Sequence, residues 1–262
     1  MSDVIAPAGP RRRLRRFLRF DVLEFGLICT FIAIAASVIA TPNIEVPAEL
    51  RALGEAYGPH RNSEHYEEWM IRDFFQDRRG GVFLDVGANH YRTFNNTYYL
   101  ESALGWSGIA VEPLVEFEAD YRQQRPRTRF RPFFVSDVSN SEAKLYLTEN
   151  SLVTSAEKAF TDRYGAITRE ITAPTITLTD LLDAEGVEQI DFLSMDIELH
   201  EPKALAGFDI GRFQPALVCI EAHPEVRQQI LDYFTRHDYV VVGKYLRTDE
   251  ENLYFAPVGS VR

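Results

Sequence analysis

Val82-Phe83-Leu84-Asp85-Val86-Gly87-Ala88-Asn89 is the stretch of sequence that decides the fold. Its first five residues form a mostly hydrophobic run ending at Gly87, which is typical of a strand buried on both faces of a parallel sheet. A glycine directly after such a strand lets backbone amides approach a ligand closely. The dinucleotide-binding pattern G-x-G-x-x-G would need glycines where Asn89 and Arg92 stand. The stretch therefore predicts a ligand-binding α/β domain and argues against a nicotinamide-dependent oxidoreductase.

On both sides of this stretch, short hydrophobic runs alternate with segments of helical pattern, which indicates βαβ units and a parallel sheet. Further strands are expected at 108–112, 130–135, 190–196, 216–221, 239–242 and 252–256. Helices are expected at 63–76, 95–104, 115–124, 202–207 and 225–236. Residues 139–176 are interpreted as an insertion that holds a hairpin, with one arm at 143–147, and a mobile connection through Gly165. The pattern predicts a Rossmann-like, mostly parallel seven-stranded sheet with helices on both faces.

The N-terminal region has a different composition. Six arginines lie between residues 11 and 19, and an uncharged, mostly apolar run follows from 25 to 40. This run of 16 residues is shorter than the roughly 20 that span a bilayer. A signal anchor, a cleaved signal peptide and an interfacial or protein-docking helix all fit it. We expect a basic segment and a hydrophobic membrane-associated helix at 1–41, with membrane attachment through residues 22–41, a Pro- and Gly-rich linker at 42–62, and one domain at 63–262.

Charge and cysteine usage exclude several classes of function. Residues 1–41 carry a net charge of +3, whereas the remaining 221 residues carry −14. A domain this acidic is a poor match for the phosphate backbone of nucleic acids. The two cysteines, Cys29 and Cys219, both lie in apolar runs and suggest neither a disulfide framework nor a metal knuckle. Nucleic acid is therefore not an expected partner.

Acidic side chains stand at or near the ends of five predicted strands. They are Asp85, Glu112, Asp137, Asp196 and Glu221. In open α/β sheets, ligands bind outside the carboxyl ends of the strands, where the strand order reverses. The five carboxylates are therefore expected to converge on one cleft, and a surplus of acid in a cleft suits a cationic ligand that carries hydroxyl groups.

From about residue 81 to 256 the chain resembles the FkbM family of S-adenosylmethionine-dependent methyltransferases. The resemblance rests on the order and spacing of six motifs. They are the stretch 82–89 quoted above, Val111-Glu112-Pro113, Val135-Ser136-Asp137, the run 177–182, the run from Ile190 to Glu198, and Val218-Cys219-Ile220-Glu221-Ala222-His223.

This resemblance implies that S-adenosylmethionine is the cofactor and that it binds at the ends of the first three strands. Glu112, one helix after the first strand, is also placed by the sequence pattern to accept hydrogen bonds from ribose hydroxyls. The methionine end of the cofactor is expected to lie beside Asp85, Gly87 and Asn89. Glu112 is expected to hold the ribose, and Ser136 and Asp137 are expected to border the adenine.

The acceptor is expected to face Asp196, Glu198, Glu221 and His223, again by resemblance. Transfer to a hydroxyl needs a base for its proton, and the candidates by residue type are His223 and His200, with Asp196 as orienter or alternative base. Asp196, Glu221 and His223 could instead bind a divalent metal, but the sequence shows no ligand spacing for one. No metal site is therefore predicted.

Two departures from the family pattern bear on activity. Where the family usually has a second glycine shortly after Asn89, this chain has His90-Tyr91-Arg92. Where the family usually has Gly-Ala-Glu after Glu198, this chain has Leu199-His200-Glu201. The first change is expected to place bulk near the methionine end of the cofactor, and the second beside the acceptor.

The sequence therefore predicts a membrane-associated enzyme that methylates a hydroxyl of a small molecule, sugar or lipid. The bacterial inner membrane is the expected location, with the side of the catalytic domain left open. The two departures favour one alternative, a catalytically inactive methyltransferase-like accessory subunit of a membrane protein complex.

Overall fold

The computed structural model describes residues 47–59 and 61–260. A seven-stranded sheet runs through this part of the chain in the order β3-β2-β1-β7-β8-β10-β9. Five of the strands are parallel, and β10 is antiparallel to both of its neighbours. The strands of this sheet are β1 (Val82–Val86), β2 (Ser107–Val111), β3 (Thr128–Arg131), β7 (Phe192–Met195), β8 (Leu217–Glu221), β9 (Tyr239–Val241) and β10 (Asn252–Pro257). The Rossmann-like, mostly parallel sheet expected from the sequence is confirmed.

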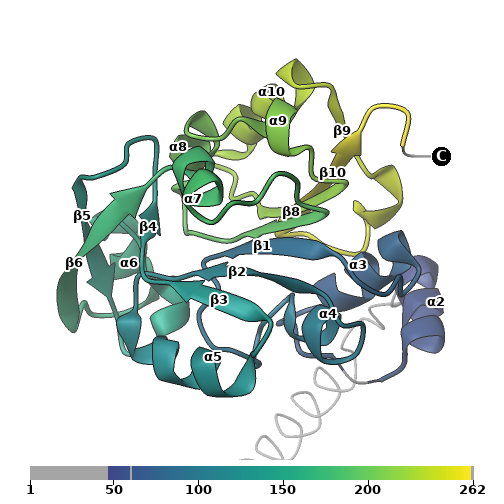
Figure 1. The fold of residues 1–262 in the computed structure, drawn as a ribbon, viewed down its shortest axis with the longest axis horizontal. Helices are drawn as coiled ribbons and strands as arrows, with labels where there is room; N and C mark the ends of the chain where they lie inside the picture. The colour runs from purple at the N-terminus through teal and green to yellow at the C-terminus, as the bar shows by residue number, and fades with distance from the viewer. Residues whose placement is uncertain (1–46, 60, 261–262) are drawn as a thin grey trace, which may run out of the picture. The chain divides into compact units, whose positions relative to one another are not determined.

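The order of the strands reverses beside β1. The chain passes from β1 outward to β2 and β3, and later returns to place β7 on the other side of β1 (Figure 1). Such a switch point leaves a crevice at the carboxyl ends of the two central strands, because the connections leave them in opposite directions. The fold therefore locates the candidate site between the ends of β1 and β7.

Helices cover both faces of the sheet (Figure 1). On one face, Leu84 and Val86 of β1 pack into a core with α7, α8, α9 and α10. Phe83 points to the opposite face and packs with α3 and α4, as the two-residue period of a strand requires. The helices are α2 (Ala48–Tyr57), α3 (Glu67–Phe75), α4 (Tyr98–Ser102), α5 (Glu118–Gln124), α6 (Lys158–Tyr164), α7 (Leu178–Ala184), α8 (Glu201–Ala206), α9 (Ile210–Phe213) and α10 (Arg227–Arg236), with single 3₁₀ turns η1 (Val115–Phe117), η2 (Ser151–Val153) and η3 (Gly243–Tyr245).

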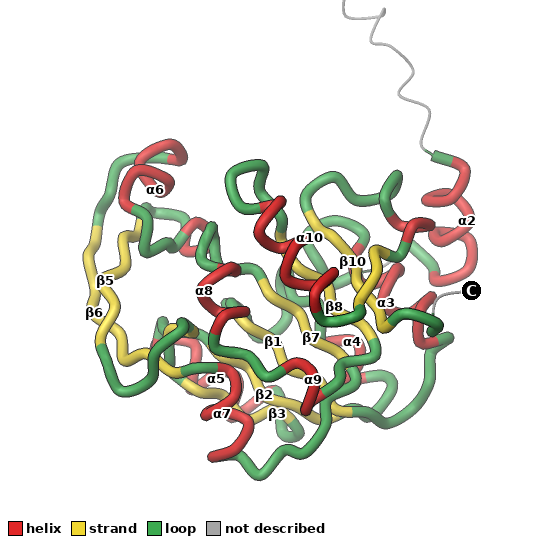
Figure 2. The backbone as a smooth tube through the Cα atoms, turned by 90° about the horizontal axis from the view of Figure 1, so that it is seen from above, coloured by secondary structure: helices red, strands yellow, loops and turns green. Residues whose placement is uncertain are grey.

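The predicted insertion and the short strand before it form a second, three-stranded sheet beside the main one (Figure 2). Its order is β4-β6-β5, and its strands are β4 (Phe134–Val135), β5 (Glu142–Leu147) and β6 (Arg169–Ile176). β5 and β6 pair antiparallel along their length, which confirms the predicted hairpin and its arm. The segment between them contains η2 and α6, so the long connection has helical structure of its own.

Two expectations about single elements were wrong. The run 130–135 is not one strand: β3 ends at Arg131 and β4 joins the second sheet, because Pro132 lacks the N–H that would continue the pairing. The expected linker 42–62 contains α2, which is rich in strong helix formers and begins after Pro47. α2 packs closely on α3, since a Cβ at Gly54 would lie 3.2 Å from the ring of Trp69.

The predicted hydrophobic helix at 22–41 lies outside the described residues. Within 47–59 and 61–260, no helix has the length and apolar character needed to cross a bilayer.

Candidate functional site

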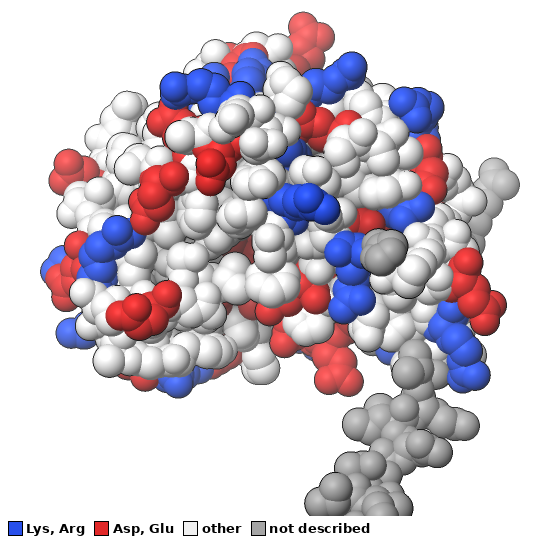
Figure 3. All heavy atoms as spheres, turned by 90° about the horizontal axis from the view of Figure 1, so that it is seen from below, with Lys and Arg blue, Asp and Glu red and all other residues white. Residues whose placement is uncertain are grey.

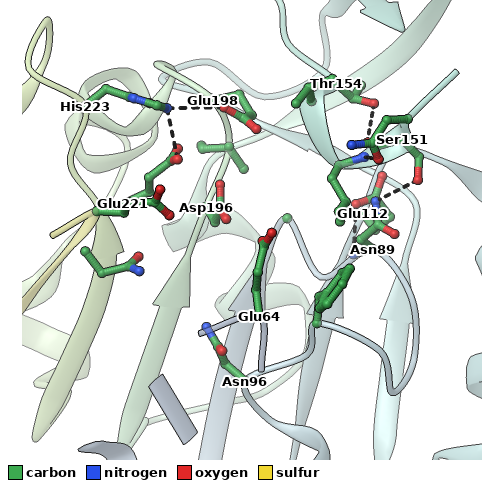
Figure 4. A pocket seen from close by; sticks show the side chains of 18 of the residues that line it. Glu64, Asn89, Asn96, Glu112, Ser151, Thr154, Asp196, Glu198, Glu221 and His223 are labelled. Carbon is green, nitrogen blue, oxygen red and sulfur yellow. Dashed lines mark hydrogen bonds and ion pairs between the residues drawn. The ribbon is translucent and has the colours of Figure 1, made fainter. Parts of the chain in front are cut away.

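A cavity of about 310 Å³ opens at the carboxyl ends of β1, β2, β7 and β8. It is lined at one end by Gly87, Asn89 and Glu112, and at the other by Glu221 and His223. Figure 4 shows Asn89 and Glu112 on one side of the cavity and Glu221 and His223 on the other. We call the first group the cofactor end and the second, together with Asp196 and Glu198, the acceptor end.

Glu112 is the central side chain of the cofactor end. It directly follows β2 and is 4% exposed. Its two carboxylate oxygens accept hydrogen bonds from the backbone amides of Asn89, at 3.1 Å, and Leu114, at 2.9 Å. Burial raises the pKa of Glu112 to about 7, although these two hydrogen bonds act in the opposite direction. A carboxylate offers about four lone-pair sites, so two remain free to accept hydrogen bonds from a ligand in the cavity.

A glycine is required at position 87 because the ends of β1 and β7 lie very close together there. Its φ is +81°, and a Cβ placed there would lie 1.8 Å from the backbone oxygen of Asp196. Only a glycine therefore allows the ends of β1 and β7 to come this close. The sequence interpretation attributed this glycine to a close ligand approach, whereas the observed contact is with the neighbouring strand end, and Gly87 also lines the cavity.

Asp85 does not line the cavity. Its carboxylate is buried and accepts hydrogen bonds from the hydroxyl of Thr97, at 2.7 Å, and the amide of Asn95, at 3.2 Å. Arg125 donates hydrogen bonds to the same two side chains. Burial raises the pKa of Asp85, and the charge of Arg125 acts in the opposite direction. The observed role of Asp85 is to hold the segment after β1 in place, and its contact with a cofactor stays a prediction.

The first departure from the family pattern leaves the cavity open. None of His90, Tyr91 and Arg92 is among the residues that line it. The ring nitrogen Nδ1 of His90 accepts hydrogen bonds from the backbone amides of Arg92 and Thr93, which stabilises a turn outside the cavity. These side chains therefore add no bulk to the cavity itself, and their effect on a bound cofactor stays a prediction.

The acceptor end brings together four side chains from the ends of β7 and β8. The ring nitrogen Nε2 of His223 lies 2.9 Å from a carboxylate oxygen of Glu221 and 3.4 Å from one of Glu198. Asp196 reaches toward the same group from the end of β7 (Figure 4). The four residues that the sequence assigned to the acceptor thus lie around one point.

Carboxylates dominate the electrostatics of the acceptor end. Burial and the neighbouring charges of Glu221 raise the pKa of Glu198 to about 8. The hydrogen bond to Glu221 raises the pKa of His223 to about 9. Asp196 is exposed to the solvent inside the cavity. Desolvation by the cavity walls and the charges of three nearby glutamates raise its pKa well above the ordinary value. The cluster therefore binds protons more tightly than its members would separately.

The whole cavity is acidic. Seven of its lining residues carry carboxylates, and among the described residues no lysine or arginine lines it. On the outer face drawn in Figure 3, by contrast, basic side chains are scattered among acidic and uncharged ones without forming a continuous basic patch. The cavity is thus suited to a ligand of positive charge, as the sequence predicted.

His200, Ser136 and Asp137 form a separate group that does not line the cavity. The buried ring of His200 lies 3.1 Å from the hydroxyl of Ser136 and contacts the ring of Phe134. Asp137 is exposed and accepts a hydrogen bond from Ser136. Burial lowers the pKa of His200 to about 4. Asp137, like Asp85, does not line the cavity, so the expected convergence of all five strand-end acids was wrong. The contact of Ser136 and Asp137 with the adenine and the role of His200 as a base stay predictions.

Some lining residues were missed by the sequence interpretation. The segment 150–154, which contains η2, returns from the insertion to line the cavity, and Ser151 accepts a hydrogen bond from the side chain of Asn89 at 3.3 Å. Glu64, which precedes α3, lines it as well. No local pattern in the sequence marks these positions, since their contacts join residues far apart in the chain.

This topology, with an acidic cleft at the β1–β7 switch point, defines the class of Rossmann-like methyltransferases. The family model described as the methyltransferase FkbM domain matches residues 85–241. That range is more than half of the chain, and the chain therefore belongs to the FkbM family. Its cofactor is S-adenosylmethionine.

Similar solved structures are methyltransferases. A TehB-like S-adenosylmethionine-dependent methyltransferase from Corynebacterium glutamicum is 15% identical, with a TM-score of 0.42 and coverage of 79% of this chain and 93% of the other. An O-methyltransferase from Bacillus cereus in complex with SAH is 12% identical, with a TM-score of 0.41 and coverage of 86% and 96%. These low values support no argument about the acceptor. A search of curated proteins found no match.

The cavity fits the cofactor of this family. The sulfonium and ammonium groups of S-adenosylmethionine are cationic, and the surrounding carboxylates complement them. The free lone pairs of the buried Glu112 are available to ribose hydroxyls. The fit therefore rests on the described side chains and agrees with the family assignment.

Proposed function

We propose that the chain methylates a hydroxyl group of a small molecule, sugar or lipid. The observation that carries this proposal is the cluster of Asp196, Glu198, Glu221 and His223 at the opposite end of the cavity from Glu112. The cavity thus has one end for the cofactor's ribose and another with groups that hold and deprotonate a hydroxyl. Proximity of two bound reactants supplies a large part of the rate of such a transfer.

Each end of the cavity has its own role in the proposed reaction. Glu112 and the backbone around Gly87 would hold the cofactor, which would supply an electrophilic methyl group. The cluster would orient the acceptor hydroxyl and take the proton that its oxygen loses on methylation. Asp196 lies between the two ends of the cavity, since its backbone oxygen adjoins Gly87 and its carboxyl group interacts with Glu221.

We further propose that residues 22–41 attach the protein to a membrane, the bacterial inner membrane being the expected one. The support is the sequence alone, an arginine-rich segment followed by an uncharged apolar run. A lipid-linked or membrane-bound acceptor is compatible with this attachment.

Two measurements on the full-length chain test the function. Calorimetry should show S-adenosylmethionine binding with a dissociation constant on the order of 1–100 μM, and Glu112→Gln should weaken it by at least about tenfold, because a charged acceptor is lost from the ribose site. Transfer of a labelled methyl group into lipid or sugar extracts should then identify the acceptor fraction. Absence of any heat with the cofactor or with S-adenosylhomocysteine would contradict the proposal, and binding without transfer, with a stoichiometric membrane partner, would support the accessory-subunit alternative.

A further inference from the structure

The acceptor end has the composition and spacing of a metal site. Glu198, Glu221 and His223 each offer one ligand atom, and the three atoms lie within 4.8 Å of one another. Glu221 ends β8 and His223 follows it by two residues, whereas Glu198 lies in the turn three residues after β7, so two neighbouring parallel strands bring the triad together. We propose that this triad binds a divalent first-row cation such as Mn²⁺.

The distances agree with ligands arranged around one ion. Ligands about 2.1 Å from a metal lie about 3.0 Å apart at right angles and about 3.4 Å apart at the tetrahedral angle. Nε2 of His223 lies 2.9 Å from Glu221 and 3.4 Å from Glu198. An ion can therefore lie among the three ligand atoms with little movement of the side chains.

Glu221 supplies an independent sign of a missing ligand. Its oxygen Oε2 is fully buried and has no hydrogen-bond partner, although the other oxygen contacts His223. A buried carboxylate oxygen without a partner is costly. No lysine or arginine among the described residues lines the cavity, and the neighbouring side chain of Asp196 is a carboxyl group as well. A bound cation would compensate this oxygen, as would a proton shared with Asp196, and the Mn²⁺ titration below distinguishes the two.

The ligand types favour a transition metal over an organic cation. Carboxylates alone would suit Mg²⁺ or Ca²⁺, whereas one imidazole with two carboxylates suits Mn²⁺ and its first-row neighbours. An ammonium group has several N–H donors and needs a hydrogen-bond acceptor for each, whereas the imidazole of His223 provides at most one acceptor nitrogen. Three protein ligands leave coordination positions open for water and for an acceptor oxygen. This last role rests on the proposed function, whereas the ion site itself does not.

Titration of the full-length chain with Mn²⁺, followed by electron paramagnetic resonance of the free ion, tests the site. We expect one bound ion per chain, and we expect His223→Gln and Glu221→Gln each to weaken binding by at least about tenfold. Glu64→Gln is the matched control, since it removes an exposed carboxylate of the same cavity outside the triad, and it should leave the affinity nearly unchanged. Thermal melts of each variant confirm that it is folded.

No saturable binding below about 1 mM free Mn²⁺, or equal binding by the wild type and His223→Gln, would overturn the inference. Cofactor calorimetry in the presence of a chelator separates this outcome from a failure of the proposed function. If S-adenosylmethionine binds and Mn²⁺ does not, the function stands and the ion site is wrong. If Mn²⁺ binds to the triad and neither the cofactor nor methyl transfer is detected, the ion site stands and the function is wrong.

Discussion

The two ends of the cavity are built in different ways. At the cofactor end, Glu112 is held by backbone amides that directly follow two strands. At the acceptor end, His223, Glu221 and Glu198 hold one another through side-chain charges, and Oε2 of Glu221 is left without a partner. A cofactor end fixed by the backbone tolerates few changes, whereas an acceptor end made of side chains can be adapted to different acceptors. The comparison predicts that cofactor binding and turnover can be changed separately.

The largest expected effect is on turnover. Asp196→Asn removes a central carboxylate of the cluster without changing its shape, and we expect kcat to fall by about 10²- to 10⁴-fold because a proton acceptor is lost. Calorimetry should show nearly unchanged affinity for S-adenosylmethionine. A parallel loss of cofactor affinity would contradict the separation of the two ends.

The next prediction concerns Asp85, whose buried hydrogen bonds hold the segment after β1. Asp85→Ala removes the carboxylate that accepts from the buried Thr97 hydroxyl and from the Asn95 amide, while Arg125 stays paired with Glu101, and we expect the free energy of unfolding to fall by about 2 kcal/mol. Denaturant melts measure the loss, and Asp120→Ala, at an exposed position, should change stability by less than about 0.5 kcal/mol. A stable Asp85→Ala variant that fails to bind cofactor would instead show that Asp85 contacts the cofactor directly.

The cofactor affinity should depend on pH through Glu112, whose pKa is about 7 in the free cavity. The ionised carboxylate is the better acceptor for ribose hydroxyls, so below this pKa the cofactor must displace a proton from Glu112. Affinity should therefore fall about tenfold between pH 8 and pH 6. Calorimetry at both values measures the change. In Glu112→Gln the contribution of this group disappears, and an undiminished pH dependence in that variant would assign it to another residue.

The smallest effect concerns the second departure from the family pattern. Leu199 has a φ of +75°, a conformation that strains a residue with a Cβ, at the position where the family usually has glycine. Leu199→Gly and Leu199→Ala both remove the apolar side chain, and we expect the glycine variant to be more stable by about 1 kcal/mol. At an ordinary helix or strand position alanine is the more stable of the two. Chemical denaturation of the pair gives the sign directly.

The sequence predicted the parts of the site that directly follow strands. Gly87, Glu112, Asp196 and Glu221 line one cavity because parallel strands bring their carboxyl ends to one edge, and the hydrophobic runs mark those ends. His223 lies two residues beyond the end of β8 and was assigned to the site by resemblance to the family and by its residue type. The main sheet was predictable for the same physical reason, since buried parallel strands have a strong local pattern.

The rest of the site depends on where the chain travels between strands. At Pro132 the chain leaves the main sheet, which carries Ser136 and Asp137 into the second sheet and to His200 instead of to the cavity. The segment 150–154 lies between the two arms of the hairpin and lines the cavity. No local sequence pattern predicts that the hairpin packs beside the cavity. Sequence periodicity reports which residues are buried in an element, but not the tertiary contacts of a long connection.

The most direct test of the account is an experimental structure of the full-length chain with S-adenosylhomocysteine. We predict that the ribose hydroxyls donate hydrogen bonds to Glu112 and that the sulfur lies between Gly87 and the cluster around Asp196. A ribose bound away from Glu112, or a sulfur facing away from Asp196 and His223, would contradict the division of the cavity into a cofactor end and an acceptor end.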